Sequence, residues 1–433
     1  MDFSTIVGRV AAVVGAVTVS VRHAGDPIRQ PLYGTTPKIP DPRPQGNLPT
    51  LKMPTARGWS GGRTPVAAKG LKVNAFATGL VHPRNMLVLP NGDVLVAESM
   101  GESGKSRTLF DHAMKGTLKR ARAMGDSPNR ITLLRDANGD GVAEVRHTLI
   151  DNVRQPFGMA LIGNTLYVGA SDAVLAYPFE PGTTRITTPG RKLMSMKAGG
   201  HWTRNLIASK DGTKLYVAVG SLTNIGDKGM EAEADRACIH ELDLATGTSR
   251  IFAGGLRNAV GMAWEPGSDT LWTVVNERDG IGDETPPDYL TSVRDGGFYG
   301  WPYCYWNRVV DDRVPQDAAK VASALQPDYA LGGHTASLGL CWLPAGTLPG
   351  FPAGMAIGQH GSWNRSKLSG YKMLFVPFEN GQPNGMPRDL LTGFLSAGER
   401  YSYGRPVGVA LAADNAVLMA DDVGDVIWRV TPA

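Results

Sequence analysis

The chain has 433 residues and a formal net charge of +4, and charged residues make up 19% of it. Gly (54 residues) and Pro (30 residues) are abundant, which is typical of many short strands joined by tight turns and not of a helical bundle. The small, dispersed net charge gives no sign of the basic surface of a nucleic-acid-binding protein. A chain of this length is too long for a domain with one ordinary hydrophobic core, whereas a closed ring of repeated sheets can contain it.

The N-terminal region divides into an apolar segment and a linker. Residues Ile6–Val21 are apolar apart from Arg9. Such a stretch fits the core of a signal peptide better than a spanning helix, which needs about 20 apolar residues. No clean Ala-x-Ala site follows, so residues 1–25 are expected to be a signal peptide or an uncleaved membrane anchor of a periplasmic protein, with a buried helix as the alternative. Residues 26–70 are rich in Pro and Gly and are predicted to form an extended linker.

From about Leu71 onward, one local pattern recurs along the chain. Each copy has a small or apolar entry, a turn with Asn, Asp or Gly, and a short strand that ends on a small or polar residue. The copies are Val81–Glu98, Gln155–Ala170, His201–Gly220, Leu256–Val275 and Arg405–Asp421, with a degraded copy in Ser337–Tyr371. Repeats of this kind are typical of the four-stranded antiparallel blades of a propeller, so residues 71–433 are predicted to form one all-β propeller.

Some intervals between copies exceed the usual blade length of about 40–50 residues and therefore contain insertions. Residues 100–129 include Thr108–Met124, whose spacing predicts a basic amphipathic helix. Such a helix contacts an anionic membrane or a partner, or it is a solvated helix on the side of the propeller. A second insertion, Ala318–Leu338, carries His334. Near the C-terminus, Asp425–Val430 is expected to pair with an N-terminal strand and close the ring.

A propeller brings the start of every innermost strand to one central opening. The residues that precede the repeated strands are therefore expected to converge, and they are Arg84, Gln155, His201, Arg257, Asn258 and Arg405. An imidazole such as His201 can act there as a general base, because its ordinary pKa is near neutrality. Arg257 can bind a carboxylate or a developing oxyanion. Taken singly, the alternatives are a His that bonds a turn and an Arg in a salt bridge.

The densest group of acidic residues lies in Asn276–Tyr305 and includes Asp279, Asp283 and Glu284. Carboxylates and Gly-rich main-chain carbonyls are typical of calcium, which takes about six to eight oxygen ligands. The aromatic run that follows can form the wall of a pocket for a planar ring or a sugar. The alternative is an acidic, solvated loop that leads into a buried aromatic strand.

Further cationic groups come from the last two repeats. His360 and Arg365 lie in GQHGSWNR, and Arg405 lies in GRPVG. Three or more cationic side chains at one opening suit a small polyanion. The sequence therefore predicts a site that binds an anionic ligand beside a general base.

Three other sequence features give only weak evidence about function. Asp136–Glu144 resembles the start of a calcium loop, but His147 stands where the bidentate acid belongs, so we interpret it as a hairpin turn, with a structural calcium site as the alternative. Gly361–Trp363 does not fit the GxSxG elbow of a serine hydrolase. The three cysteines have neither zinc nor haem spacing, and one disulfide remains open.

Seven motifs, in order across about residues 150–430, resemble those of the soluble quinoprotein sugar dehydrogenases, which use pyrroloquinoline quinone (PQQ). The closest resemblance is to their L-sorbosone dehydrogenase branch. The motifs are GGHWTRNL (199–206), GLRNAVGMAW (255–264), NERDGIGDETPPDYLT (276–291), GGFYGWPYCYW (296–306), GGHTASLGL (332–340), GQHGSWNR (358–365) and GRPVGVAL (404–411). Each motif is weak alone, but the ordered set is specific. The resemblance implies a six-bladed β-propeller that holds PQQ over calcium.

The resemblance also implies roles for individual residues. The family's catalytic His corresponds to His201, and its Arg-Asn pair corresponds to Arg257 and Asn258. The calcium-binding carbonyls fall on Arg278 and Asp279, with Asp283 and Glu284 of the same acidic stretch assigned to the metal. The remaining residues assigned to the cofactor are Gln155, Tyr299, Arg365 and Arg405.

The chain departs from the family pattern in three places. Gly200 stands where some members have an Asp before the catalytic His, so another group, such as a backbone carbonyl, must orient His201. The lysine found near the cofactor in some members has no clear match, and Lys367 and Arg365 are the candidates. The insertion at 100–129 has no counterpart.

The activity implied by the resemblance is oxidation of a sugar or a sugar-derived aldehyde. His201 would take the proton of the substrate hydroxyl while hydride passes to the quinone, and Arg257 would stabilise the developing oxyanion. An external quinone or cytochrome would then take the electrons, because the sequence carries no haem motif. Two other classes stay open: a calcium-dependent propeller lactonase, and a non-catalytic, membrane-attached binding propeller.

Overall fold

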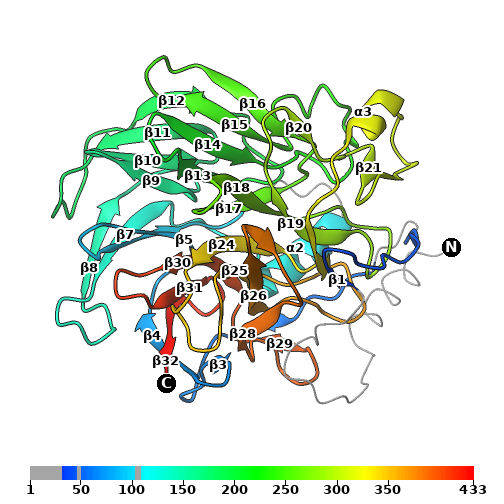
Figure 1. The fold of residues 1–433 in the computed structure, drawn as a ribbon. Helices are drawn as coiled ribbons and strands as arrows, with labels where there is room; N and C mark the ends of the chain where they lie inside the picture. Colours follow the sequence, from blue (N-terminus) through cyan, green and yellow to red (C-terminus); the bar gives the residue numbers. More distant parts are fainter. Residues whose placement is uncertain (1–31, 46–49, 103–108) are drawn as a thin grey trace.

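The protein is a six-bladed β-propeller. The computed structural model describes residues 32–45, 50–102 and 109–433, and six antiparallel sheets follow one another around a common centre (Figure 1). The innermost strands of neighbouring blades contact one another around the whole ring. The predicted all-β propeller of four-stranded blades is confirmed. The predicted signal peptide or anchor, residues 1–25, lies outside the described residues.

Each blade contains four strands, which in the first five blades follow in chain order from the centre outward. The strands of the first three blades are β5 (Pro83–Val88), β6 (Val94–Glu98), β7 (Arg130–Arg135) and β8 (Val145–Ile150); β9 (Met159–Ile162), β10 (Thr165–Ala170), β11 (Ala173–Pro178) and β12 (Arg191–Ser195); β13 (Arg204–Ala208), β14 (Lys214–Val219), β15 (Cys238–Asp243) and β16 (Ser249–Gly254). Those of the next two blades are β17 (Ala259–Glu265), β18 (Thr270–Val275), β19 (Pro287–Ser292) and β23 (Tyr329–Gly333); β24 (Ser337–Leu343), β25 (Gly354–Gln359), β26 (Lys372–Glu379) and β28 (Arg388–Thr392).

The last blade closes the ring with a strand from the start of the propeller. Its strands are β30 (Pro406–Leu411), β31 (Val417–Asp421), β32 (Val426–Pro432) and β4 (Leu71–Ala77). β32 pairs antiparallel with β4, with Val430 opposite Val73, and the red and blue strands lie together in Figure 1. The expected closure is confirmed, and the two ends of the propeller are held by main-chain hydrogen bonds.

Apolar side chains between adjacent blades form the core. Between the fourth and fifth blades, Trp272 (fully buried) packs edge-on against Phe378 with ring centroids 5.0 Å apart. Comparable clusters fill the other junctions. The second strand of each blade is apolar on both faces, as in VLVAE of β6, because neighbouring blades cover both of its sides.

The described part of the predicted linker packs on the propeller. β1 (Tyr33–Gly34) adds to β23, β2 (Thr55–Ala56) pairs with β29 (Tyr401–Ser402), and β3 (Val66–Ala67) adds to β28. The backbone N–H of Arg43 donates to the carbonyl of Ile281 at 2.6 Å. The segment is extended, but hydrogen bonds attach it to the fourth, fifth and sixth blades.

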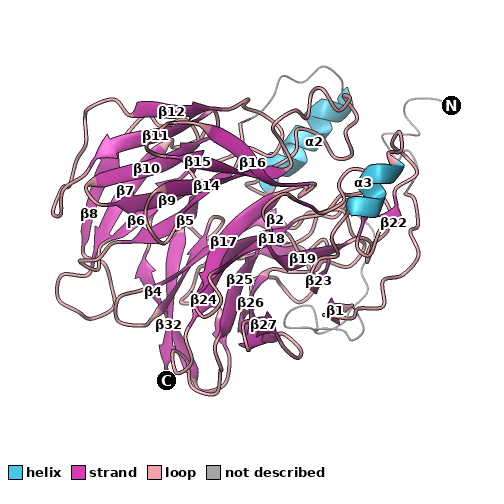
Figure 2. Ribbon diagram, turned by 45° about the horizontal axis from the view of Figure 1, so that its top comes forward, coloured by secondary structure: helices cyan, strands magenta, loops and turns pink. Residues whose placement is uncertain are grey.

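The two insertions carry the helices of the described chain, α2 (Leu109–Arg120) and α3 (Ala318–Ser323). Figure 2 shows both at the edge of the sheets, away from the C-terminus. The helix predicted at Thr108–Met124 is therefore present, and its described part, Leu109–Arg120, ends four residues earlier than expected. Within the described part of the chain, no helix combines the length and apolar character needed to cross a membrane.

The remaining short strands and the weaker sequence features are local. The short strands are β20 (Gly297–Phe298), β21 (Cys304–Tyr305), β22 (Val309–Val310) and β27 (Gln382–Pro383). Asp136–Glu144 forms the turn between β7 and β8, where the Asp136 carboxylate accepts from the N–H groups of Gly139 and Gly141, both at 2.7 Å. It is a hairpin turn, as interpreted. The three cysteines are free.

Candidate active site

The register of the blades determines which face carries the site. The first residue of an innermost strand lies opposite the last residue of the second strand, as in Pro83 opposite Glu98 and Pro406 opposite Asp421. Loops that precede the first strand and loops that follow the second strand therefore open on one face of the ring. Residues from both kinds of loop meet there.

A cavity of about 230 Å³ lies on this face. Five of the six blades contribute to it, with Trp202 and Leu338 as apolar lining. Its polar lining is His82, Arg84, His201, Thr203, Asn258, His360 and Asp422. The predicted convergence is confirmed for Arg84, His201 and Asn258.

His201 lies in a tight loop, residues 197–203, which we call the histidine loop. Gly199 and Gly200 both have positive φ (94° and 61°), and a Cβ on Gly200 would lie 2.5 Å from the Leu222 Cα. Only glycine tolerates both the conformation and this close approach. Gly200 therefore lets the histidine loop pack on residues 221–222.

A backbone carbonyl orients the imidazole, as the sequence suggested. His201 Nδ1 lies 2.9 Å from the Ser221 carbonyl oxygen and 3.0 Å from Ser221 Oγ, and that hydroxyl donates to the Thr223 carbonyl at 2.7 Å. A carbonyl only accepts hydrogen bonds, so Nδ1 carries the proton and Nε2 carries the lone pair. Among the described residues Nε2 has no hydrogen-bond partner.

The electrostatic surroundings keep His201 neutral. Burial, together with the nearby positive charge of Arg257, lowers its pKa to about 3. The imidazole is therefore uncharged near neutral pH, with an unprotonated Nε2. This is the form that a general base requires.

Arg257 and Asn258 lie directly beside His201. The Ser221 N–H donates to the Arg257 carbonyl at 2.7 Å, and a Cβ on Gly220 would lie 2.3 Å from Asn258 Oδ1 and 2.6 Å from His201 Cβ. Arg257 and Asn258 therefore lie on the same face of the ring as His201, and residues 220–221 connect them to it. The Asn258 amide oxygen is buried without a hydrogen-bond donor among the described residues.

The Arg257 guanidinium joins the histidine loop to the acidic loop, residues 276–288. It donates to the Glu277 carbonyl at 2.6 Å and to Asn224 Oδ1 at 2.9 Å, and it lies 3.4 Å from Asp279 Oδ2. Asn224 also accepts from the Asp279 N–H at 2.9 Å and donates to the Asp279 carbonyl at 3.1 Å. Arg257 and Asn224 together fix the position of Asp279.

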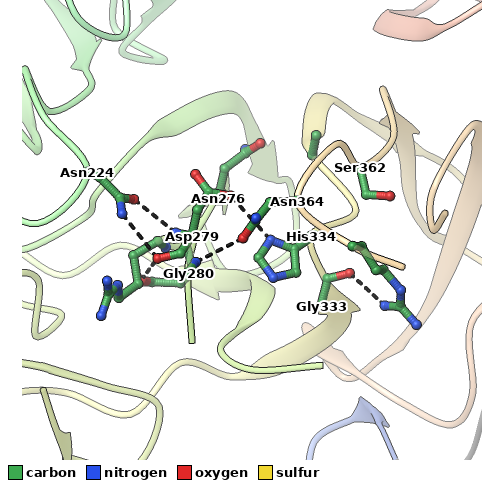
Figure 3. A network of polar contacts seen from close by, with 12 residues as sticks. Asn224, Asn276, Asp279, Gly280, Gly333, His334, Ser362 and Asn364 are labelled. Atoms are coloured by element: carbon green, nitrogen blue, oxygen red, sulfur yellow. Dashed lines mark hydrogen bonds and ion pairs between the residues drawn. The ribbon is translucent and has the colours of Figure 1, made fainter. Parts of the chain in front are cut away.

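Asp279 is the centre of the network in Figure 3. Its Oδ1 lies 3.3 Å from His334 Nδ1, and His334 Nε2 donates to the Gly282 carbonyl at 2.8 Å. Burial favours the neutral acid, but the His334 hydrogen bond and the Arg257 charge outweigh it and lower the pKa of Asp279. The next N–H, that of Gly280, donates to Asn364 Oδ1 at 2.9 Å. The acidic loop thus holds a buried carboxylate anion near His201.

The other acidic residues assigned to a metal point elsewhere. Glu284 pairs with Arg365 at 2.5 Å, and Asp283 accepts from the Ser366 N–H at 3.1 Å. The Arg278 side chain pairs with Asp311 at 2.5 Å. In the described ranges, no three His, Cys, Asp or Glu side chains are placed to share a metal ion.

A second charged cluster faces His201 across the cavity. Asp422 binds Arg84 Nη1, accepts from His360 Nε2 at 2.8 Å and lies 3.5 Å from His82 Nε2. Despite its burial, these neighbours hold the pKa of Asp422 well below its usual range. Burial and the charge of Arg405 lower the pKa of His360 to about 3. Arg405 lies behind this cluster and donates to the His360 carbonyl at 2.8 Å.

Of the residues predicted to hold the cofactor, Gln155, Tyr299, Arg365 and Arg405 lie outside the cavity lining, and so does the predicted catalytic residue Arg257. Gln155 donates to the Met100 carbonyl at 3.0 Å, and Arg365 holds the carbonyls of Asp283 and Gly333, each at 3.1 Å. Tyr299 is buried in the core, where its hydroxyl donates to the Ser292 carbonyl at 2.5 Å and burial raises its pKa to about 12. These three side chains donate to main-chain carbonyls and stabilise the loops around the site.

Sequence reasoning missed His82 and Asp422. Asp422 follows the second strand of the last blade, β31, and His82 precedes β5 of the first. Asp422 was missed because only residues before a first strand were considered, although residues after a second strand reach the same opening. Applied to each repeat, that rule selects Asp422 and also His360.

Comparison with known proteins gives a consistent result. A family profile described as TrAA12-like matches residues 65–433. A PQQ-dependent sugar dehydrogenase of Hypocrea jecorina is 26% identical over 272 residues, covering 56% of this chain and 57% of the relative. A PQQ-dependent pyranose dehydrogenase of Coprinopsis cinerea is 24% identical over 421 residues, covering 83% of this chain and 53% of the relative. The match spans little more than half the length of these two curated relatives.

Solved structures agree on the fold. A calcium structure of a Trichoderma reesei family AA12 carbohydrate-active enzyme superposes with a TM-score of 0.70 at 21% identity, covering 89% of this chain and 99% of that one. The profile match includes the closing strand β4, all six blades and every residue of the cavity lining. The chain therefore belongs to the TrAA12-like family.

Proposed function

We propose that this protein oxidises a sugar or a sugar-derived aldehyde, of the aldose or sorbosone type, with PQQ as cofactor and calcium as metal. One observation carries the proposal: His201 lines the cavity as a neutral imidazole whose Nε2 has no partner among the described residues. The two curated relatives, both PQQ-dependent dehydrogenases of sugars or pyranoses, support the same activity.

The residues present fit PQQ, a flat quinone with three carboxylates. Arg84 lines the cavity, and its Nε is buried without an acceptor among the described residues. Arg405 lies behind His360, and Asn258 offers an amide at the wall. Arg84, Arg405 and Asn258 would hold the cofactor, because guanidinium groups are the preferred partners of carboxylates.

The acidic loop fits a calcium ion bound mainly by main-chain oxygens. The carbonyls of Arg278 and Asp279 would be the ligands, since calcium prefers hard oxygen donors. Glu277 Oε1 is a buried acceptor without a donor among the described residues, and burial raises the pKa of this carboxyl to about 8. A cation bound nearby would lower this pKa and would also be attracted by the anionic Asp279.

The protein's own residues then explain the proton transfer. PQQ would supply a quinone as hydride acceptor and calcium would supply Lewis-acid chemistry, whereas the proton is handled by the chain's own residues. His201 Nε2 accepts the proton of the substrate hydroxyl, while Ser221 keeps the ring oriented through Nδ1. Arg257 would favour negative charge on the substrate oxygen through its positive charge, which lies next to His201, because its guanidinium donors are already bonded to Asn224 and the acidic loop.

Reconstitution tests this function. Protein loaded with PQQ and calcium is expected to reduce an electron-accepting dye with aldoses or sorbosone, and His201→Ala should lower kcat by about 10²–10⁴-fold. His147→Ala, at an exposed position of β8, is the matched control and should keep full activity. Protein that binds PQQ but reduces no dye with any sugar or aldehyde would refute the proposal.

The same assay separates the two other classes. Lactone hydrolysis without PQQ would indicate a calcium-dependent lactonase, and binding without turnover would indicate a non-catalytic propeller. We further propose that the chain acts in the periplasm, with the apolar N-terminal segment as signal peptide or anchor, and that a quinone or cytochrome takes its electrons. Cell fractionation tests the location, and a purely cytoplasmic protein would contradict it.

A further inference from the structure

Two buried arginines behind the histidine loop, Arg204 and Arg236, bond main-chain carbonyls. Arg204 is fully buried and Arg236 is 6% exposed, and neither forms an ion pair in the described part of the chain. Burial lowers the pKa of Arg204 to about 9 and also lowers that of Arg236. A buried cation is costly unless its surroundings compensate it. The compensation here comes from a set of main-chain carbonyls.

All three nitrogens of the Arg236 guanidinium donate to carbonyls around His201. The acceptors are Lys197 (2.8 Å), Gly199 (2.7 Å), His201 (3.1 Å), Gly220 (3.0 Å) and Ser221 (3.3 Å). The Ser221 carbonyl is the one that accepts from His201 Nδ1. Arg236 therefore holds both the histidine loop and the group that orients the imidazole.

Arg204 holds the same loop from β13. Its Nη1 donates to the His201 carbonyl at 2.8 Å and to the Thr203 carbonyl at 2.9 Å, and its Nη2 donates to the Lys197 carbonyl at 3.0 Å. The carbonyls of Lys197 and His201 each receive hydrogen bonds from both arginines. Side-chain hydrogen bonds thus replace regular secondary structure in fixing this loop.

The turn that carries Arg236 is itself fixed by side-chain hydrogen bonds and has an unusual backbone conformation. From the same turn, Glu233 accepts from the N–H groups of Leu222 (2.6 Å) and Thr223 (2.8 Å). Two nearby non-glycine residues, Asp235 and Ala237, have positive φ of 64° and 50°. Such strain persists where the surroundings demand it, and it is concentrated at functional sites.

We propose that Arg236 and Arg204 are positioning residues for His201. By fixing the carbonyls of the histidine loop and of Ser221, they keep the Nδ1 proton on Ser221 and the Nε2 lone pair in the cavity. Their charges also oppose a positive charge on the ring. The catalytic consequence rests on the proposed function, whereas the protonation pattern of the imidazole is a property of the chain alone.

The test compares Arg236→Met with Arg250→Met. Methionine keeps part of the side-chain volume but none of the donors. Arg250 lines the same outer cavity of about 570 Å³ as Arg236, but its guanidinium binds Glu241 and Asp295, so it is the matched control. Nitrogen-15 NMR of histidine-labelled protein without cofactor shows which nitrogen is protonated, and His201→Ala identifies the signal.

We expect His201 to be protonated at Nδ1 alone in the wild type and in Arg250→Met, and to show a mixture of tautomers in Arg236→Met. In protein loaded with PQQ and calcium, Arg236→Met should lower kcat about tenfold to a hundredfold, with KM changed less than about twofold. Arg236→Lys, which keeps the charge and some donors, should recover part of the loss.

The outcomes are distinguishable from failure of the proposed function. If the loaded wild type were inactive, the tautomer of His201 in the variants would still test whether Arg236 positions the imidazole. If Arg236→Met did not unfold cooperatively, the same measurements on Arg236→Lys would replace it, with a partial shift toward mixed tautomers expected. An unchanged tautomer together with unchanged kcat in the folded variant would overturn the proposal.

Discussion

At the scale of single residues, the site depends on the Ser221 carbonyl. It accepts from the backbone N–H of His201 at 3.0 Å and from the ring Nδ1 at 2.9 Å. A carboxylate in this place would raise the pKa of the imidazole and favour the cation. An uncharged carbonyl orients the ring with less stabilisation of the charged form, so burial and Arg257 set its pKa. This explains how His201 is oriented although Gly200 replaces an acidic neighbour.

The low pKa of His201 has a consequence for stability. The ordinary value of 6.5 applies to the unfolded chain, and burial lowers the folded value to about 3. Between these values the unfolded chain binds a proton that the folded chain does not, so the contribution of His201 to the free energy of unfolding decreases as the pH falls below about 6.5. His201→Gln should remove part of this decrease, in protein without cofactor.

Urea unfolding at several pH values checks this expectation. The variant should show a shallower loss of stability than the wild type between neutral and mildly acid pH. His360, whose pKa is also lowered to about 3, accounts for part of the slope that remains. An identical pH dependence in wild type and variant would mean that His201 titrates normally in the folded protein.

At the scale of elements, the end of β14 sets the spacing of the site. Gly220 follows Val219 and lies between His201 and Asn258, where a Cβ would come within 2.6 Å of each residue's side chain. Real Cβ atoms do not approach so closely, so any larger residue must push the two side chains apart. The glycine therefore fixes the distance between the general base and its amide neighbour.

Gly220→Ala is expected to separate activity from folding. The shift of His201 should lower kcat by about a hundredfold, because a misplacement of about 1 Å has this effect, and overpacking should cost about 1–3 kcal/mol of stability. Gly254→Ala, at the end of β16 in the same blade, meets nothing closer than 3.9 Å and is the control. Dye reduction and thermal unfolding measure both effects. Wild-type kcat in Gly220→Ala would show that the cavity tolerates movement of His201.

The N-terminal segment is held to the last blade by a buried carboxylate. Trp59 Nε1 donates to Asp421 Oδ2 at 2.7 Å, and Trp428 Nε1 donates to the same oxygen at 3.1 Å. Burial raises the pKa of Asp421 to about 6, above the unfolded value of 3.8. The folded chain therefore keeps a proton that the unfolded chain loses, and the contribution of this group to stability falls as the pH rises from about 3.8 to about 6.

Trp59→Phe tests this attachment while keeping an aromatic ring. Above about pH 7, where Asp421 is ionised, losing the donor should cost about 1.5–3 kcal/mol, and below about pH 5 the cost should be smaller. Trp264→Phe removes a neutral hydrogen bond to the Ala208 carbonyl (2.8 Å) and should cost about 0.5–1.5 kcal/mol at every pH. Denaturant unfolding at both pH values measures the difference. A pH-independent cost in Trp59→Phe would contradict the assignment.

At the scale of the whole molecule, the repeats made the propeller predictable, because each copy encodes one first strand and one second strand. His201 and Asn258 were found for the same reason. Gln155, Tyr299 and Arg365 occupy suitable positions, but sequence does not determine the direction of a side chain, and theirs bond neighbouring loops. His82 and Asp422 come from the first and last blades and meet only after the ring closes through β32 and β4.

The assignment of the acidic loop shows the same limit. Composition predicted a calcium site in the acidic loop, and the structure places one buried carboxylate anion of that loop, Asp279, near His201. Composition did not distinguish Asp279 from Asp283 and Glu284. In the structure Asp279 faces Arg257, whereas Asp283 and Glu284 bond residues 365–366. The packing of the fourth blade against the fifth determines those partners, and no local pattern records it.

Calorimetric titration of PQQ into the purified protein tests the central claim most directly. With calcium present, we predict one PQQ per chain, weaker binding when calcium is chelated, and an affinity at least about tenfold lower in Arg84→Gln, the loss of about 1.4 kcal/mol expected for a charged contact. Absence of binding in the presence of calcium, or equal affinity in Arg84→Gln and wild type, would contradict a PQQ site at the common opening of the blades.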